Sequence, residues 1–519
     1  MAQAASPGSM PEPGRYVDAG KLPPWEVGTL PAPPPYSFRN AVKITGAGAI
    51  ILGGAIGSGE WLIGPAVTAQ FTAALLWVAT ISILLQWIFN EEACRYTVYT
   101  GEPIFSGFMR TRPGAAFWGW FYSVLGFIQL GWPGWAAAAA TAIVAAMIGA
   151  VPGPEHAGQV LFWGYVTFFA SLALLLVGKK VETALEIAEK FMVVWIIAAL
   201  LILGLLFATA QTWLTVITGF LGGGLYYIRS PQTGELMGLI PSGADWLILA
   251  GFAAYAGAGG LGNCTVTNWT RDKGLGMGSQ VGYIPAMVGG HQVELSPTGK
   301  VFDPTPENVS KFREWMKYVR FDQGWVFTLG CFIGMGLPAL LTVQFIAPGT
   351  QVGGMGVAVR QAEGIAAAFG GLGTGLGMTL WIGTLLTGFW ILYSTQLNIM
   401  DLFPRTVTDI LWTSNPAVRA WAKGDVRKVY YSSLIVFVAW GCIAINLAQP
   451  FILIILGAFM AGLLMSIYGV HVWYVNRTLL PKEIQAPMWR QIALLVFSGF
   501  FGFFTLVVIL NRVFGINIG

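Results

Sequence analysis

The stretch Gly53–Pro65, GGAIGSGEWLIGP, lies in the middle of the first long apolar segment of the chain. It places several glycines, a proline and one carboxylate, Glu60, where a membrane helix is expected to be most regular. Glycine weakens a helix by about 1 kcal/mol relative to alanine, and a carboxylate inside a membrane is costly and usually functional. The stretch therefore predicts an interrupted membrane helix at a functional site.

The composition indicates the class of protein. Of the 519 residues, 55% are hydrophobic and 10% are charged, and the mean hydropathy is +0.66. A soluble chain carries about 25% charged residues. Because so little polar surface is left to face water, we predict an all-α polytopic membrane protein embedded in a lipid bilayer. The basic residues are spread over short loops, which argues against a nucleic-acid partner.

Eleven stretches are long and apolar enough to cross a membrane, which takes about 20 residues. These predicted spans are 42–70, 72–93, 114–150, 160–177, 184–207, 245–269, 324–347, 372–399, 429–446, 450–474 and 489–511. Lysine and arginine concentrate in cytoplasmic loops, and all but three of the 28 fall on one side when the N-terminus is placed in the cytoplasm. We therefore predict a cell-membrane protein with a cytoplasmic N-terminus and an extracytoplasmic C-terminus.

The spans divide the chain into two repeats of five and one additional span. The predicted parts are a disordered proline-rich cytoplasmic tail (1–41), the first repeat (42–207), an extracytoplasmic loop (208–244), the second repeat (245–475) with a cytoplasmic insert (271–323), and a loop with span 11 (476–519).

The sixth span repeats the pattern of the first. It contains AYAGAGGLGNCTVTNW, where Gly257, Gly259, Gly260 and Gly262 precede Asn263. Unwound backbone survives at membrane depth only beside protein or a water-filled cavity. Paired interruptions in corresponding positions of two halves are the best sequence indication of a binding site in an inverted-repeat transporter. We therefore predict a site between interrupted spans 1 and 6.

At these residues the chain resembles the Nramp (natural resistance-associated macrophage protein) family of divalent-metal transporters, which has the LeuT-type inverted-repeat fold. The likeness runs through ITGAGAIILGGAIGSGEWLIGPAVTAQFTAALLWVATISILLQWIFNEEACRYTVYTGEPI in the first two spans, IPSGADWLILAGFAAYAGAGGLGNCTV in span 6 and YVRFDQGW before span 7. The resemblance implies a secondary transporter that works by alternating access, in which spans 1, 2, 6 and 7 rock against the rest.

The residues at the family's metal site differ in this chain. The family has Asp-Pro-Gly-Asn in span 1, where this chain has GSGE, so Gly57 replaces the aspartate and Glu60 the asparagine. The family's Met-Pro-His in span 6 corresponds to Leu261–Asn263, which removes the thioether and the histidine. Span 3 holds the amide Gln129 but no acid for protons, and span 9 lacks a mid-membrane arginine. The chain thus resembles a divergent member without the standard transition-metal site or proton relay.

The groups left at the predicted site are oxygen ligands. The predicted metal ligands are the Glu60 carboxylate and the Asn263 amide, and the other predicted binding residues are Gly54, Gly57, Ser58, Ala258 and Leu261. Oxygen-only sets suit hard cations such as Mg²⁺, Mn²⁺ or Ca²⁺. We therefore expect a small inorganic cation as the transported partner, and no resident cofactor.

Two other functions stay open. The motif AIGSGEW also resembles the Ile-Gly-Ser-Gly signature of amino-acid transporters in the same superfamily, whose half-helix amides receive a substrate carboxylate. Glu60 would compete for these amides, and two anions repel in a low dielectric, so an organic amine fits this alternative better. The third function is a non-transporting membrane sensor. Glu60 itself has two alternative roles, as a cap on the exposed amides of span 1 and as a proton carrier.

Polar residues outside the two interruptions complete the predictions. The predicted pathway residues are Gln129, Thr395 and Gln396, and the predicted gate cluster at the cytoplasmic edge of span 2 is Glu91, Glu92 and Arg95. No nucleotide-binding motif and no nucleophile–base–acid set is present, so an enzyme is not expected. The oligomeric state is not predicted.

Overall fold

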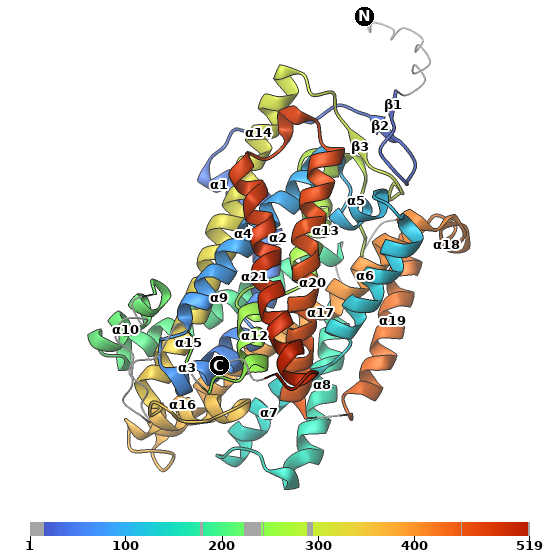
Figure 1. The fold of residues 1–519 in the computed structure, drawn as a ribbon. Coiled ribbons are helices and arrows are strands. Elements are labelled where there is room, and N and C mark those ends of the chain that lie inside the picture. Colours follow the sequence, from blue (N-terminus) through green and yellow to red (C-terminus); the bar gives the residue numbers. More distant parts are fainter. Residues whose placement is uncertain are drawn as a thin grey trace, which may run out of the picture.

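Long helices that run side by side, with a small sheet at one end, make up the protein (Figure 1). This computed structural model describes residues 15–176, 180–222, 240–241, 243–287, 294–447 and 449–516. Within these ranges, nine helical segments are long and apolar enough to cross a membrane. The chain is therefore an integral membrane protein. We call the end of the bundle that carries the strands the sheet end, and the other the opposite end.

The first repeat contains the predicted interruption. Its segments are α2 (Ala47–Ala55), a π-helical turn (Gly59–Ile63) and α3 (Gly64–Phe71) in span 1, α4 (Leu76–Thr100) in span 2, α6 (Ala115–Leu130) and α7 (Gly134–Ile148) in span 3, α8 (Ala157–Leu176) in span 4 and α9 (Val181–Phe207) in span 5. Short helices α1 (Phe38–Ile44) and α5 (Ile104–Arg110) lie at the sheet end (Figure 1). Span 3 is broken rather than continuous, because Pro133 cannot donate a backbone hydrogen bond.

The second repeat contains a corresponding series of helices. Its segments are α12 (Trp246–Tyr255) and α13 (Leu261–Asp272) in span 6, α14 (Pro306–Arg320), a π-helical segment (Phe321–Thr328) and α15 (Leu329–Phe345) in span 7, α17 (Gly375–Ser414) in span 8, α19 (Val426–Ala444) in span 9 and α20 (Pro450–Leu479) in span 10. Connecting helices are α10 (Ala210–Phe220), α16 (Met355–Ala367) and α18 (Pro416–Ala422), and α21 (Met488–Arg512) is the appended span.

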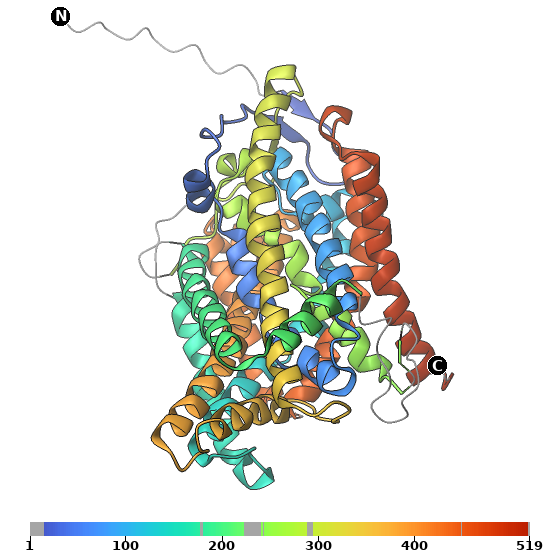
Figure 2. The same cartoon turned by 90° about the vertical axis from the view of Figure 1, so that its left-hand side faces the viewer.

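Several predicted spans are longer in the structure than in the sequence pattern. Helix α4 continues to Thr100, where Gly101 in the left-handed conformation ends it, and α17 continues to Ser414. Polar residues do not end a helix that reaches beyond the bilayer, so hydropathy underestimates its length. The amphipathic part of the predicted insert, α14, runs without a break into span 7, as the long yellow helix of Figure 2 shows. Much of the predicted loop 208–244 lies outside the described residues.

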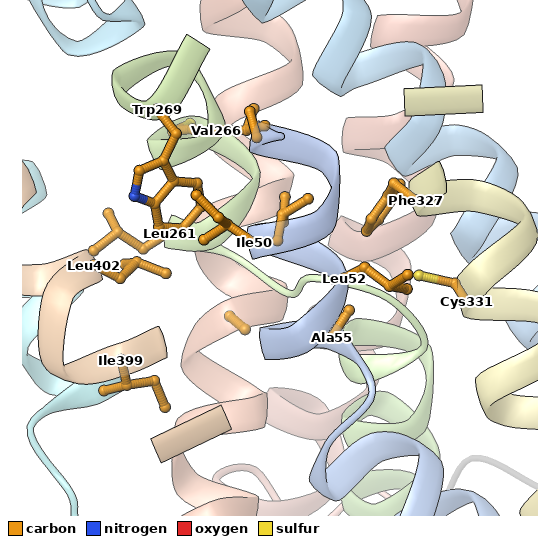
Figure 3. Close-up of a cluster of buried hydrophobic side chains, with 14 of the residues drawn as sticks. Ile50, Leu52, Ala55, Leu261, Val266, Trp269, Phe327, Cys331, Ile399 and Leu402 are labelled. Atoms are coloured by element: carbon orange, nitrogen blue, oxygen red, sulfur yellow. The ribbon is translucent and has the colours of Figure 1, made fainter. Parts of the chain in front are cut away.

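Helix α2 is enclosed by other helices rather than by lipid. It packs against α9, α13, α17 and the π-helical segment of span 7. Figure 3 shows Leu52 of α2 directed toward Phe327 and Cys331, and Ile50 on the side of Leu261. Because lipid is as apolar as these side chains, close packing and dispersion hold α2 in place rather than the hydrophobic effect.

The sheet at the sheet end involves the N-terminal tail. Strands β1 (Tyr16–Val17), β2 (Trp25–Val27) and β3 (Lys300–Val301) form it in the order β1-β2-β3, with β2 antiparallel to β1 and parallel to β3. The tail therefore differs from the disordered segment that we predict for 1–41. From Arg15 on it lies in place, because Trp25 is buried and the insert supplies a strand to pair with. Residues 1–14 lie outside the described residues.

A buried ion pair lies beneath this sheet. Arg110 donates to Glu102 Oε1 at 2.6 Å, and its guanidinium lies 4.5 Å from the ring centroid of Trp25. Burial raises the pKa of Glu102, but the charge and hydrogen bonds of Arg110, together with hydrogen bonds from Tyr96 and Gly299, outweigh burial and leave this pKa below its ordinary value. Gly299 also donates to Glu102, at 2.7 Å. The pair thus ties the tail and the insert to the end of span 2.

Candidate functional site

The two interruptions have different backbone geometry. In span 1, α2 ends at Ala55 and Ile56 adopts φ −68° and ψ 80°, which any residue can adopt. In span 6, Gly257, Gly259 and Gly260 have φ of +117°, +61° and +67°. Residues with a side chain rarely adopt these values, so the glycines are a condition for the interruption of span 6.

Glu60 joins the two interruptions. Its side chain is fully buried, Oε2 accepts a hydrogen bond from the Gly57 N–H at 3.1 Å, and Oε1 accepts one from the Gly257 N–H at 3.2 Å. Interrupting a helix leaves such N–H groups without partners. The carboxylate therefore has the capping role given above as an alternative, and it caps span 6 as well as span 1.

Two glutamines satisfy further backbone groups of span 6. Gln86 Oε1 accepts from the Gly259 N–H at 3.2 Å, and Gln129 Oε1 accepts from the Leu261 N–H at 3.0 Å. Gln129 Nε2 also donates to the carbonyl of Gly259 at 3.1 Å. Together with Glu60, these side chains occupy amides that an anionic substrate would need.

Span 8 satisfies carbonyls of span 1. Ser394 donates to the Gly53 carbonyl at 3.0 Å, Thr395 to the Gly54 carbonyl at 3.2 Å and Asn398 to the Ile50 carbonyl at 2.8 Å. These approaches are close: a Cβ on Gly54 would lie 2.6 Å from Asn398 Oδ1. The glycines of span 1 thus make room for polar side chains.

A cavity of about 30 Å³ lies between the two interruptions. Its polar lining comes from the side chains of Ser58, Gln129, Tyr255, Thr395 and Asn398 and from the backbone of glycines in both interruptions. One water occupies about 10–15 Å³ of such volume. The cavity therefore accommodates about two waters or an ion with a water, and in this conformation it is too small for an amino acid.

The structure brings most of the predicted site residues together. The predicted residues that line the cavity are Gly54, Ser58, Gln129, Ala258 and Thr395. Behind this lining, Gly57 and Leu261 donate backbone hydrogen bonds to Glu60 and Gln129.

Two predicted residues face neighbouring helices instead. Asn263 Nδ2 donates to Gln86 at 3.1 Å and to Asn90 at 2.9 Å, and Gln396 Oε1 accepts from the Ala136 N–H at 3.2 Å. Sequence reasoning missed Gln86, whose signal is a second amide four residues later, Asn90, on the same face of an apolar helix.

The predicted gate cluster is part of an ion-pair network. Arg95 donates to Glu92 at 2.7 Å, and Arg490 of α21 lies 2.6 Å from Glu92 and also pairs with Glu91. All these side chains are buried. The network joins span 2 to the appended span 11 rather than span 1 to span 6.

A second buried network, which sequence reasoning missed, joins α13 to α17 near the sheet end. Arg405 donates to Asp401 at 2.7 Å and pairs with Asp272, the last residue of α13. Arg271 pairs with Asp409 of α17. The signal was the i, i+4 spacing of Asp401, Arg405 and Asp409, which places opposite charges on one helix face. The second half of span 6 is thereby held to span 8.

No group of three or more histidine, cysteine, aspartate or glutamate side chains suited to a metal ion is found among the described residues. The site accordingly relies on one carboxylate, amides, hydroxyls and backbone groups.

Comparison with known proteins establishes the fold. No family model matches the sequence, and a search of curated proteins found no significant match. Among solved structures, a mutant of the manganese transporter of Eremococcus coleocola matches with a TM-score of 0.62 and 14% identity over 95% of this chain and 92% of that chain. The same transporter in complex with an aromatic bis-isothiourea substituted compound matches with a TM-score of 0.59 and 15% identity over the same shares. The predicted LeuT-type fold with interrupted spans 1 and 6 is confirmed; at this identity the likeness concerns the fold alone.

Proposed function

We propose that this protein is a secondary transporter that carries an inorganic divalent cation of the hard-ligand type, such as Mg²⁺ or Mn²⁺, by alternating access. The cation binds in the cavity between the two interruptions. Oxygens of Gly54, Ser58, Ala258 and Thr395 surround it, and Glu60 supplies negative charge from directly behind the lining. The fold supports this proposal, because the Eremococcus coleocola protein that shares it is a manganese transporter.

The hydrogen bonds of Glu60 carry the proposal. In a transporter of amino acids with this fold, a substrate carboxylate would occupy the free amides of the interrupted helices. Here the protein's own carboxylate accepts hydrogen bonds from the Gly57 and Gly257 amides. A second anion at this place would be repelled, whereas a cation is attracted. The small volume of the cavity, about 30 Å³, also favours an ion over an organic solute.

Asn263 stays a proposed ligand. Its Nδ2 is held by Gln86 and Asn90, while its buried Oδ1 has no hydrogen-bond partner among the described residues. An amide oxygen is a ligand for hard cations. We expect this oxygen to reach the ion when α13 moves.

The predicted cytoplasmic side is closed in this conformation. Besides the network around Arg405, Lys273 pairs with Glu186 of α9 at 2.7 Å, and the Gly48 N–H donates to Asp322 at 2.6 Å. The Arg405 network and the Lys273 pair hold span 6 against spans 8 and 5, whereas the Gly48 contact joins spans 1 and 7. Alternating access, in which spans 1, 2, 6 and 7 move together, requires that the contacts of span 6 with spans 5 and 8 break when the cavity opens to this side.

Transport by the purified full-length protein in liposomes tests the proposal. We would measure uptake of Mg²⁺, Mn²⁺ and Ca²⁺ with internal indicators, in parallel with labelled amino acids, for the wild type, Glu60→Gln and Glu363→Gln. The last variant makes the same chemical change at an exposed position of α16. We expect cation uptake by the wild type and Glu363→Gln. We expect at least about tenfold slower uptake by Glu60→Gln, since hydrogen bonds to a charged group contribute about 1.5–3 kcal/mol.

The alternatives give different results in the same assay. Cation uptake that is insensitive to Glu60→Gln would remove Glu60 from the site. Amino-acid or amine uptake without cation uptake would favour the organic-solute transporter, and uptake of neither would favour the sensor.

A further inference from the structure

Helix α9 presents three glutamates to α2. Glu182, Glu186 and Glu189 are spaced i, i+4, i+7, so they share one face of α9, and their residues are 1%, 6% and 0% exposed. Helix α2 and its N-cap carry glycine where two of them approach. A Cβ on Gly46 would lie 2.6 Å from Glu186 Oε1, and a Cβ on Gly53 would lie 2.0 Å from Glu189 Oε2. The contact between spans 1 and 5 is therefore built around carboxyl groups.

The outer part of this face has positive partners. Glu186 forms ion pairs with Lys190 of its own helix and with Lys273, the latter at 2.7 Å. Lys273 also lies 3.7 Å from Glu182. These two glutamates are close to the sheet end, where α9 begins, and Lys190 is directed to Glu186 rather than to its neighbour Glu189.

Glu189, the innermost of the three, differs from the other two in having no ion pair with any residue that the structure describes. Neither of its carboxyl oxygens has a hydrogen-bond partner among the described residues. Helices α2, α8, α15 and α17 pack against α9. Neither α2 nor α8 carries a charged residue. The only ionisable side chain of α15 is the thiol of Cys331, and the ionisable group that faces Glu189 from α17 is Tyr393. In the part of the chain that the structure describes, no cation thus neutralises this carboxylate.

A bare carboxylate in this position is not stable. Enclosing an unpaired charge in protein costs several kcal/mol, and in practice such a group is neutralised instead. A metal ion would need several oxygens at about 2.0–2.6 Å, but Glu189 Oε2 lies directly against the backbone of Gly53. A proton needs no such shell of ligands.

Resting on the transport function proposed above, we propose that Glu189 binds the proton that is coupled to cation transport, and that Glu186 and Glu182 form its route to the sheet end. Binding converts the Glu189 carboxylate to a carboxylic acid by forming one O–H bond, and release breaks that bond; no other reactant is required.

The position of Glu189 explains the coupling. Gly53, which it contacts, precedes Gly54 in the cavity lining, and Ser394 of span 8 donates to the Gly53 carbonyl at 3.0 Å. The closed conformation encloses Glu189 completely and therefore requires it to be neutral. When α2 moves away from α9, water reaches the carboxyl group and the proton exchanges. The protein thus closes around its cation only after a proton has bound.

Glu189→Gln separates coupling from cation binding, because glutamine has nearly the same shape and is always neutral. In liposomes we would measure net cation uptake with and without an inward proton gradient, proton entry with an internal pH dye, and cation exchange at equilibrium. We expect the wild type and Glu363→Gln to show gradient-driven uptake with proton entry. We expect Glu189→Gln to retain exchange and to lose both proton entry and the response to the gradient.

Two transport results would overturn the proposal: proton-driven uptake that persists in Glu189→Gln, or wild-type uptake driven by a sodium gradient and not by a proton gradient. If no tested cation is transported, that result counts against the transport function and not against the proton site. Infrared difference spectroscopy tests the proton site independently of transport. A protonated-carboxyl C=O band present in the wild type and in Glu363→Gln but absent in Glu189→Gln supports the site. A band that Glu189→Gln leaves unchanged overturns it.

Discussion

The interruptions of spans 1 and 6 both lie in glycine clusters, yet the glycines serve different purposes. In span 6 they allow backbone angles that other residues rarely adopt, such as φ +67° and ψ −120° at Gly260. In span 1 no glycine from Gly46 to Gly59 has a φ in the left-handed region, and the absent side chains make room for Glu189, Asn398 and Thr395. The same sequence signal thus reflects backbone conformation in one helix and close approach in the other.

The largest loss of stability is expected from substitution of Glu60, whose carboxylate bonds to both interruptions. Glu60→Ala removes the acceptor for the amides of Gly57 and Gly257 and leaves both N–H groups buried without a partner. Each unsatisfied group costs about 1–3 kcal/mol, so we expect a loss of about 2–6 kcal/mol in the free energy of unfolding. Reversible denaturation in mixed detergent micelles measures it. A loss below about 0.5 kcal/mol, typical of surface substitutions, would mean that Glu60 does not hold the two helices together.

The next effect tests the backbone requirement in span 6. We expect Gly260→Ala to lower the free energy of unfolding by about 1–3 kcal/mol, because alanine is strained at this φ and ψ. A Cβ here would also lie 2.4 Å from Gln129 Oε1. Because Gln129→Ala also removes hydrogen bonds to span 6, the cost of Gly260→Ala is compared in the wild type and in the Gln129→Ala background. If backbone strain dominates, this cost is the same in both; a smaller cost in the Gln129→Ala background would show that side-chain crowding is the cause.

In span 1 we expect side-chain crowding, rather than backbone strain, to destabilise a variant with a substituted glycine. Gly53→Ala forces a Cβ to within 2.0 Å of Glu189 Oε2, at a backbone conformation that alanine adopts easily. We expect a loss of about 1–3 kcal/mol from overpacking and partial recovery when Glu189→Ala is added. A double-mutant cycle measures the coupling, which we expect to be about 1–2 kcal/mol in favour of the double variant. Additive losses would contradict the close-approach explanation.

The smallest effect is expected at a glycine that neither explanation requires. Gly262 lies within α13, and a Cβ there would have its nearest neighbour at 3.5 Å, an ordinary contact. Alanine is the better helix former by up to about 1 kcal/mol, so we expect Gly262→Ala to keep or slightly raise the stability. A loss of more than about 1 kcal/mol would imply that α13 must approach its neighbours more closely than this conformation shows.

The fold was largely predictable because it depends on properties of short segments. Hydropathy located the helices, and the glycine clusters located both interruptions, including that of α12 and α13. The cavity lining was predictable where it belongs to the interruptions, as for Ser58 and Ala258. It was not predictable for Trp135, which lies in α7, the second segment of the broken span 3, and donates to Ser58 at 2.9 Å.

The sequence by itself determined that the chain crosses a membrane and that spans 1 and 6 are interrupted, since hydropathy and helix propensity act within one or two turns. Only the tertiary structure decided what Glu60 and Glu189 contact. Glu60 bonds to an amide 197 residues away, and Glu189 lies against Gly53 of a helix four spans earlier. Such contacts depend on how helices pack, and a carboxyl group in a membrane takes its charge and its role from the groups that packing places around it.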